Sequence, residues 1–178
     1  MANKNNQVII AYYPGADKAD AAANQLKSWD SANDAVKLGG IGILTWDDGK
    51  VKTRKVGGRA GGSGAKWGTV LGVATGILTG GVTLIGGAIA GAAGGAVLGT
   101  FFHKSLGLND EDKTRLEDHL KQGGAALVAM ADEDEVAATS AELTSLGGKV
   151  ESYEVPQETM DKADEAEKVQ AAEEEPKA

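Results

Sequence analysis

The sequence predicts an α+β fold, in which a ferredoxin-like pair of β-α-β units is interrupted by an apolar helical hairpin and followed by an acidic tail. Similar strand–helix–strand patterns occur near both ends of the 178-residue chain, and two such units are typical of the ferredoxin-like sandwich. Between them lies a run of glycine, alanine and aliphatic residues. We therefore divide the chain into residues 1–60, 61–104, 105–156 and 157–178.

The first unit is predicted to contain a strand, a helix and a β-ribbon. The β-branched and aromatic run at 7–13 is typical of a buried strand. From residue 16 the apolar spacing is that of a helix, and residues 30–34 are expected to form a loop. Strands are expected over 36–46, where glycines weaken the strand or mark a bulge, and over 51–56, after an Asp-Asp-Gly-Lys turn. The helical stripe consists of Ala19, Ala22, Ala23, Leu26 and Trp29.

The second unit is preceded by a polar helix over 109–122, which carries Leu116 and Leu120 on one side. A strand over 125–131 follows a Gly-Gly pair that ends this helix. Asp132 and Glu135 then fit a capping box before an amphipathic helix, which carries Val136, Leu143 and Leu146 and stops at Gly147-Gly148. The last strand is expected over 149–155.

The handedness of the two units predicts how the sheet is covered. Crossover connections are right-handed, so the helices of both units are expected on the same face of the sheet. The opposite face then needs a cover. The polar helix over 109–122, the apolar insert or a second subunit could provide it.

Glycines recur every fourth residue in the middle of the chain. The stretch 67–102 has no charged residue and contains eleven glycines. In a helix this spacing places the glycines on one face, and the close packing that such a face permits drives helix association in lipid. In water each helical glycine costs about 0.5–1 kcal/mol relative to alanine, so these helices are expected to have partners. The zipper positions are Gly64, Gly68, Gly72, Gly76 and Gly80, then Gly87, Gly91, Gly95 and Gly99.

The length of this stretch favours a helical hairpin. A single helix of 36 residues would be about 54 Å long, against about 30 Å for the hydrocarbon core of a bilayer. The spacing breaks between Gly80 and Gly87, where a turn would give arms of about 22 and 26 Å. Basic residues on both sides predict that both ends lie in the cytosol. The membrane-interface candidates are Lys55, Arg59, Lys66, Trp67, Phe101, Phe102 and Lys104.

Two functions follow from the hairpin. The first is a non-enzymatic, membrane-associated protein whose hairpins insert from the cytosol and pack into a homo-oligomer, with a pore or a curved membrane scaffold as variants. The second is a soluble homo-oligomer, such as a shell, tube or filament, whose hairpins bundle in its interior. Weak hydropathy favours the second, because only thirteen residues of 67–102 are Val, Ile, Leu or Phe. A third class is a regulatory module that binds a ligand on its sheet.

The same pattern resembles a bacterial family, the domain-of-unknown-function 1269 proteins, which are predicted membrane proteins. The resemblance covers roughly residues 7–155, with the acidic tail outside it. It rests on Val8-Ile9-Ile10-Ala11, the ribbon from Trp46 to Lys52, the glycine-rich hairpin, and the strand–helix–Gly-Gly-Lys-Val unit at 125–150. It implies an α+β fold interrupted by an apolar hairpin. The family has no established activity, so the resemblance transfers no site.

No motif indicates catalysis, a cofactor or a metal. The chain has no cysteine, which excludes thiolate nucleophiles and zinc–cysteine or iron–sulfur sites. The basic, glycine-rich stretch 57–68 lacks the Gly-Lys-Ser/Thr of a phosphate loop, and a flexible lead-in to the hairpin is the better interpretation. His103 is expected at the membrane interface and His119 in solvent. Asp110 and Asp112 resemble the start of a calcium loop without its glycine and glutamate, so helix capping explains them.

Charge and location complete the prediction. The net charge of -8 makes nucleic acid an unexpected partner. The tail over 157–178 holds eight acidic and three basic residues, and we expect it to be disordered and to aid solubility or to dock a basic protein partner. No secretory signal pattern is present, so the expected location is the cytoplasmic membrane, or the cytoplasm for a soluble assembly.

Overall fold

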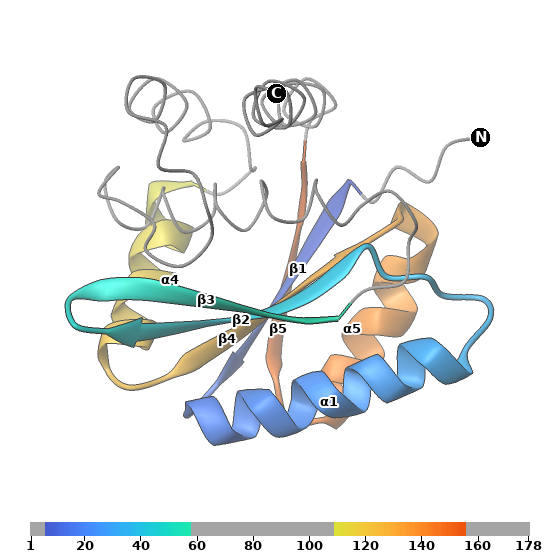
Figure 1. The fold of residues 1–178 in the computed structure, drawn as a ribbon. Helices are drawn as coiled ribbons and strands as arrows, with labels where there is room; N and C mark the ends of the chain where they lie inside the picture. The colour runs from blue at the N-terminus through green and yellow to red at the C-terminus, as the bar shows by residue number, and fades with distance from the viewer. Residues whose placement is uncertain (1–5, 58–108, 156–178) are drawn as a thin grey trace, which may run out of the picture.

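The computed structural model describes residues 6–57 and 109–155. These residues form one five-stranded antiparallel sheet, in the order β3-β2-β4-β1-β5, with three α-helices (Figure 1). The predicted α+β fold is therefore confirmed. The elements are β1 (Gln7–Tyr13), α1 (Ala16–Ala32), β2 (Gly40–Asp47), β3 (Lys50–Gly57), α4 (Asp110–Lys121), β4 (Ala125–Ala131), a short 3-10 helix (Glu133–Glu135), α5 (Val136–Ser145) and β5 (Lys149–Glu154).

The largest differences from the predicted element boundaries lie around one loop. Helix α1 continues to Ala32, and β2 begins only at Gly40. Residues 36–39 are not a strand because side chains bind their backbone: Oε1 of Glu135 accepts a hydrogen bond from Lys37 N at 2.6 Å, and Oδ1 of Asp30 accepts one from Leu38 N at 3.0 Å. Both carboxylates are buried. Two acids that are far apart in the chain therefore hold this loop.

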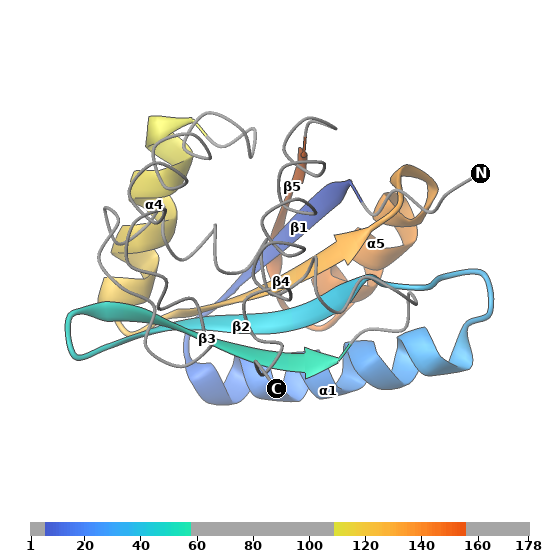
Figure 2. The ribbon, with the colours of Figure 1, turned by 45° about the horizontal axis from the view of Figure 1, so that its top comes forward.

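The sheet has an apolar layer on each face, because successive side chains of a strand point to opposite sides. Helices α1 and α5 lie together on one face, as the handedness rule predicted, and α4 lies on the other (Figure 2). The layer beneath α1 and α5, here the α1/α5 face, includes Ile9, Leu26, Ile41, Leu127 and Leu143. The opposite layer, here the α4 face, includes Val8, Ile10, Leu44, Leu116, Leu120, Val128 and Met130.

The β2–β3 ribbon has the predicted turn and irregularity. Asp48 and Gly49 have φ of 51° and 73°, which is the conformation of a tight hairpin turn that matches strand twist. The pairing of β2 with β3 shifts between Ile41 and Gly42. The glycines of this strand therefore mark a bulge, one of the two outcomes that the sequence left open.

Helices α4 and α5 both end at the predicted Gly-Gly pairs. The first glycine of each pair is left-handed, with φ of 88° at Gly123 and 85° at Gly147. The second glycine of each pair, Gly124 or Gly148, donates its N–H to the carbonyl five residues earlier, at 3.0 Å in both cases. This is the Schellman arrangement, which satisfies the last carbonyls of a helix and turns the chain sharply into the next strand.

Candidate functional site

Polar side chains from α4, β1 and β5 converge on one carboxylate oxygen at the α4 face. Oε2 of Glu151 accepts hydrogen bonds from Tyr153 Oη at 2.8 Å, from Arg115 Nη2 at 2.8 Å and from Tyr12 Oη at 3.1 Å. Arg115 Nη2 also lies 2.6 Å from Oδ1 of Asp112. We call these five residues the Glu151 cluster: Tyr12, Asp112, Arg115, Glu151 and Tyr153.

Local structure explains why these side chains meet. Glu151 lies opposite Ile10 in the β1–β5 register, so Glu151 and Tyr153 point toward the α4 face by strand alternation. Asp112 is fixed by a capping box, in which Asn109 Oδ1 accepts from Asp112 N at 2.8 Å and Asp112 Oδ2 accepts from Asn109 N at 3.3 Å. The predicted capping role of this first turn is therefore confirmed, and it positions Asp112 to hold the arginine.

The cluster changes the pKa values of its members. Burial raises the pKa of Glu151, but hydrogen bonds from Tyr153, Arg115 and Tyr12 outweigh burial, and the pKa is lowered from its ordinary 4.5. Burial and the Glu151 carboxylate raise the pKa of Tyr12 to about 12, and they also raise that of Tyr153. At neutral pH the carboxylate is therefore ionised and both phenols keep their protons. The cluster therefore joins α4 to the sheet through one ionised carboxylate.

His119 is partly buried between α4 and the sheet, so its expected place in solvent was wrong. Nε2 of its ring lies 2.8 Å from the carbonyl oxygen of Tyr13 and 3.3 Å from that of Ala125. A carbonyl only accepts hydrogen bonds, so Nε2 carries the proton. The ring also meets Tyr12 edge-on, with centroids 5.2 Å apart. This position exists because Gly124 has no side chain, and a Cβ there would collide with the ring.

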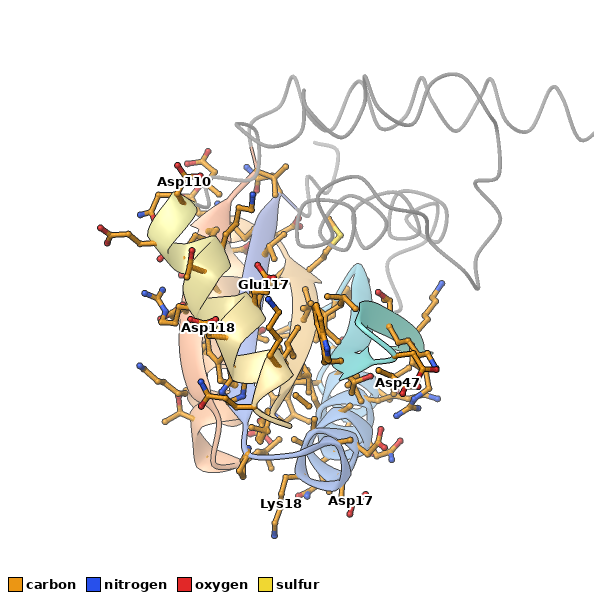
Figure 3. The ribbon with its side chains drawn as sticks, turned by 90° about the vertical axis from the view of Figure 1, so that its left-hand side faces the viewer. Asp17, Lys18, Asp47, Asp110, Glu117 and Asp118 are labelled. Carbon is orange, nitrogen blue, oxygen red and sulfur yellow. The ribbon has the colours of Figure 1, made fainter. Side chains whose placement is uncertain are left out.

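The outer surface of α4 is acidic and borders a shallow hollow of about 640 Å³. Figure 3 shows Asp110, Glu117 and Asp118 on this helix. Within residues 6–57 and 109–155 no group of three or more histidine, aspartate or glutamate residues could hold a metal ion. The hollow is lined by Asp110, Glu111, Thr114, Arg115, Asp118, His119 and Gln122.

Lys55 is the one membrane-interface candidate that the structure describes. It is exposed on β3, the strand that leads into the apolar stretch. Two nearby cations are paired inside the domain: Lys52 with Asp47, and Arg54 with Asp20 of α1. The hydrogen bond to Asp47 also raises the pKa of Lys52. Part of the positive charge before the stretch is therefore neutralised by the domain itself.

The other predicted positions lie outside the described residues. They are the nine zipper glycines from Gly64 to Gly99, the interface candidates Arg59, Lys66, Trp67, Phe101, Phe102 and Lys104, the histidine His103, and the tail over 157–178. Of the helices that the structure describes, none is long and apolar enough to cross a membrane.

Sequence reasoning missed the Glu151 cluster, although a signal for it was present. In the last strand, alternation sets Glu151 and Tyr153 on the same face as each other. On that face a sheet under a helix normally carries apolar residues. Arg115 stands next to the buried Leu116 and one turn before His119, so a cation was available at the inner edge of α4. What the sequence lacked was the strand order that brings β5 near this helix.

Comparison with protein families gives one match. A family model described as "Protein of unknown function (DUF1269)" matches residues 62–168. The match covers more than half of the chain. The chain belongs to this family. The DUF1269 match begins after β3 and runs into the acidic tail, so it includes part of a segment that the sequence resemblance had left out. Neither the curated proteins nor the solved structures that were searched give a match.

Proposed function

We propose that this DUF1269 protein is a non-enzymatic, membrane-associated protein that self-assembles through its glycine-spaced stretch, with the α+β domain in the cytosol. The observation that carries the proposal is the run of 36 uncharged residues over 67–102, in which glycines recur every fourth position. In lipid, helices with such a face associate by close backbone packing. A homo-oligomer and the bilayer are therefore the proposed partners.

The connectivity of the domain supports this proposal. We assign the domain to the ferredoxin-like arrangement, because β5-β1-β4-β2 are neighbours in that order and α1 and α5 pack on the same face. On this assignment β3, residues 58–108 and α4 are one insertion between β2 and β4. A single insertion point leaves both ends of the apolar stretch attached to one domain, as a hairpin that enters from one side of a membrane requires.

The contacts of α4 support a mechanical link between the stretch and the domain. Only residues 103–109 separate the stretch from α4. Three contacts attach this helix to the sheet in addition to its buried leucines. Arg115 binds Glu151, His119 donates to the Tyr13 carbonyl, and Lys121 lies 5.1 Å from the ring centroid of Trp46. Displacement or assembly of the stretch would therefore act on the domain through α4.

Flotation of alkaline-washed membranes tests the membrane part of the proposal. The untagged full chain is expressed, and its recovery in floated membranes is compared with that of an Ile77→Asp/Ile89→Asp variant. The matched control places the same two charges at exposed positions of α1, Asn24→Asp and Gln25→Asp. We expect wild type and control to float and the Ile77→Asp/Ile89→Asp variant to be lost from the membranes. Wild-type protein recovered as a large soluble particle would instead support the soluble assembly.

Self-assembly is tested separately in detergent. Gly72→Leu and Gly91→Leu each place a bulky side chain on the proposed packing face and should reduce the particle mass measured by light scattering. Ala35→Leu, at an exposed loop position of the domain, is the control that adds similar bulk elsewhere. If both glycine variants assemble like wild type, the proposal that the glycines drive assembly is wrong.

A further inference from the structure

Helix α4 contacts β1, β2 and β4 at one end of the α4 face, and its Arg115 also contacts Glu151 and Tyr153 of β5. His119 reaches the carbonyls of Tyr13 and Ala125, which are paired residues at the end of β1 and the start of β4, and Lys121 lies over Trp46 near the end of β2. These residues mark the same end of three neighbouring strands. We call the opposite end of this face the distal surface.

The distal surface is apolar and buried. Val8 lies opposite Met130, and both belong to the apolar layer of the α4 face together with Val155. Their exposed fractions are 5%, 0% and 0%. Among the described helices only α4 lies on this side of the sheet (Figures 1 and 2). Its contacts with β1, β2 and β4 lie at the other end of these strands. More than α4 is therefore needed to cover these side chains.

The distal surface is also smooth. Gly40 pairs with Met130 and Gly42 pairs with Val128 in the β2–β4 register, so both glycines lie on this face by alternation. Without side chains they bring the backbone of β2 to the surface. A partner whose own surface is rich in glycine can approach such a region closely.

The chain leaves the domain at the distal end of the sheet and re-enters it on the α4 face. β3 ends at Gly57, opposite Ile41, which is the distal end of the sheet. The chain returns at Asn109 to begin α4, which packs on the same face. The 51 residues over 58–108 therefore start at the distal end of the edge strand β3 and finish on the α4 face. They include the only uncharged apolar run of this length in the sequence, 67–102.

We propose that the distal surface is the docking surface for this protein's own apolar stretch, residues 67–102, when no membrane is present. The stretch and the distal surface are both uncharged and apolar. Docking removes both from contact with water, which is favourable. This inference goes beyond the proposed function. On this inference the distal surface and lipid compete for the same stretch, and docking does not depend on whether the stretch inserts into a membrane.

Site-specific cross-linking tests the docking in the full chain, because the native sequence has no cysteine. Asn6→Cys places a benzophenone probe at the distal end of β1, about 60 residues from the stretch in sequence. Asn24→Cys, exposed on α1 at the opposite face, is the control. Photolysis in lipid-free buffer and mass spectrometry of an isotopically mixed sample identify the peptide that is joined and distinguish contacts within one copy from contacts between copies.

The expected result is a cross-link from Asn6→Cys to residues 67–102 within one copy, at a yield about tenfold above that of Asn24→Cys. Equal yields, or cross-links only between copies, would overturn the proposal. Thiol labelling of Met130→Cys gives a second measurement: in lipid-free buffer it should react at least about tenfold more slowly than Asn24→Cys, because labelling requires the surface to open. Labelling at the control rate, in a variant with wild-type circular dichroism, would also contradict docking. Both tests are made without lipid, so their outcome does not depend on whether the protein floats with membranes.

Discussion

The two faces of the sheet are covered in different ways. On the α1/α5 face, two helices that follow strands of the repeated units bury a continuous apolar layer, and small side chains such as Ala19, Ala22 and Ala23 let α1 approach the sheet closely. On the α4 face, the one described helix buries two leucines and relies on charged and polar contacts for the rest of its attachment. Helix α4 therefore buries fewer apolar side chains against the sheet than α1 does.

This difference matters because the apolar stretch connects to the second face. Hydrophobic packing is non-directional and is lost only when the surfaces separate. Hydrogen bonds and ion pairs with exposed partners exchange readily with water, and each contributes little net free energy. Because α4 buries only two leucines besides these contacts, we expect it to separate from the sheet more easily than α1. The four predictions that follow test this contrast, from the largest expected effect to the smallest.

Removing a large side chain from the α1/α5 face should have the largest effect. Leu26→Ala deletes a fully buried side chain and is expected to lower the free energy of unfolding by about 2–5 kcal/mol, measured by urea denaturation. Leu120→Ala removes a side chain that is just as buried, on the other face. Its hydrogen exchange should accelerate chiefly in α4. If hydrogen exchange in Leu120→Ala were faster by the same factor in every element of the domain, α4 would be no easier to separate from the sheet than the helices of the other face.

Filling the second glycine of each Gly-Gly pair should give the next largest effect. A Cβ at Gly148 would lie 2.8 Å from the Tyr13 hydroxyl and 3.0 Å from Ala11 Cβ, so Gly148→Ala should lower the free energy of unfolding by about 1–3 kcal/mol. Gly124→Ala should cost less, because the His119 ring can turn outward. The NMR signals of His119 should move in Gly124→Ala and stay in place in Gly148→Ala, and unmoved signals in both would contradict the packing described.

Neutralising Glu151 should weaken only the α4 face. Glu151→Gln is expected to lower the free energy of unfolding at pH 7 by about 1 kcal/mol, less than the roughly 1.5–3 kcal/mol typical of hydrogen bonds to a charged group, because the Arg115 side chain is exposed to solvent. The pKa of Glu151 is lower in the folded protein than its ordinary 4.5. Its stabilisation is therefore present above about pH 4.5 and is lost as the pH falls through the folded pKa. The difference between wild type and variant should shrink in that range, and a constant difference from pH 7 to pH 3 would exclude this assignment.

Thr139→Val should have the smallest effect and the opposite sign. Thr139 is fully buried on α5, and among the residues that the structure describes its hydroxyl has no hydrogen-bond partner. Replacing it with a methyl group of the same shape removes a desolvation cost, so the free energy of unfolding should rise by up to about 1 kcal/mol. Thr144→Val is the control, because its exposed hydroxyl donates to the Ser140 carbonyl at 2.8 Å. A fall in stability in Thr139→Val would show that this hydroxyl does bind a partner.

Much of the fold could be predicted because its signals are local. Strand β1 and strand β4 begin and end where their apolar runs begin and end. Helices α4 and α5 stop at Gly-Gly pairs, since a left-handed glycine ends a helix whatever surrounds it. The capping residues Asn109 and Asp132 act within three residues of themselves. Each of these features depends on the order of residue types within a short segment, which can be read directly from the sequence.

The errors occurred where distant residues decide the outcome. Residues 36–39 look like part of a strand, but Asp30 and Glu135 bind their backbone, and Glu135 lies 98 residues from Lys37. His119 looks like a solvent residue on a polar helix, yet its ring nitrogen binds a carbonyl 106 residues away. Polar residues of this kind satisfy hydrogen bonds that exist only after the chain has folded.

Short-range spacing was thus enough to specify the strands, the helices, their caps and the tight turn of this protein, and also the uncharged, glycine-spaced stretch on which its proposed function rests. The strand order, the assembly of the Glu151 cluster, and the difference between a face covered by two helices and a face to which α4 is attached partly by polar contacts required the folded chain. The physical reason is the range of the forces involved. Backbone conformation responds to neighbours within a few residues, whereas an ion pair such as Arg115–Glu151 depends on which strands the whole domain brings together.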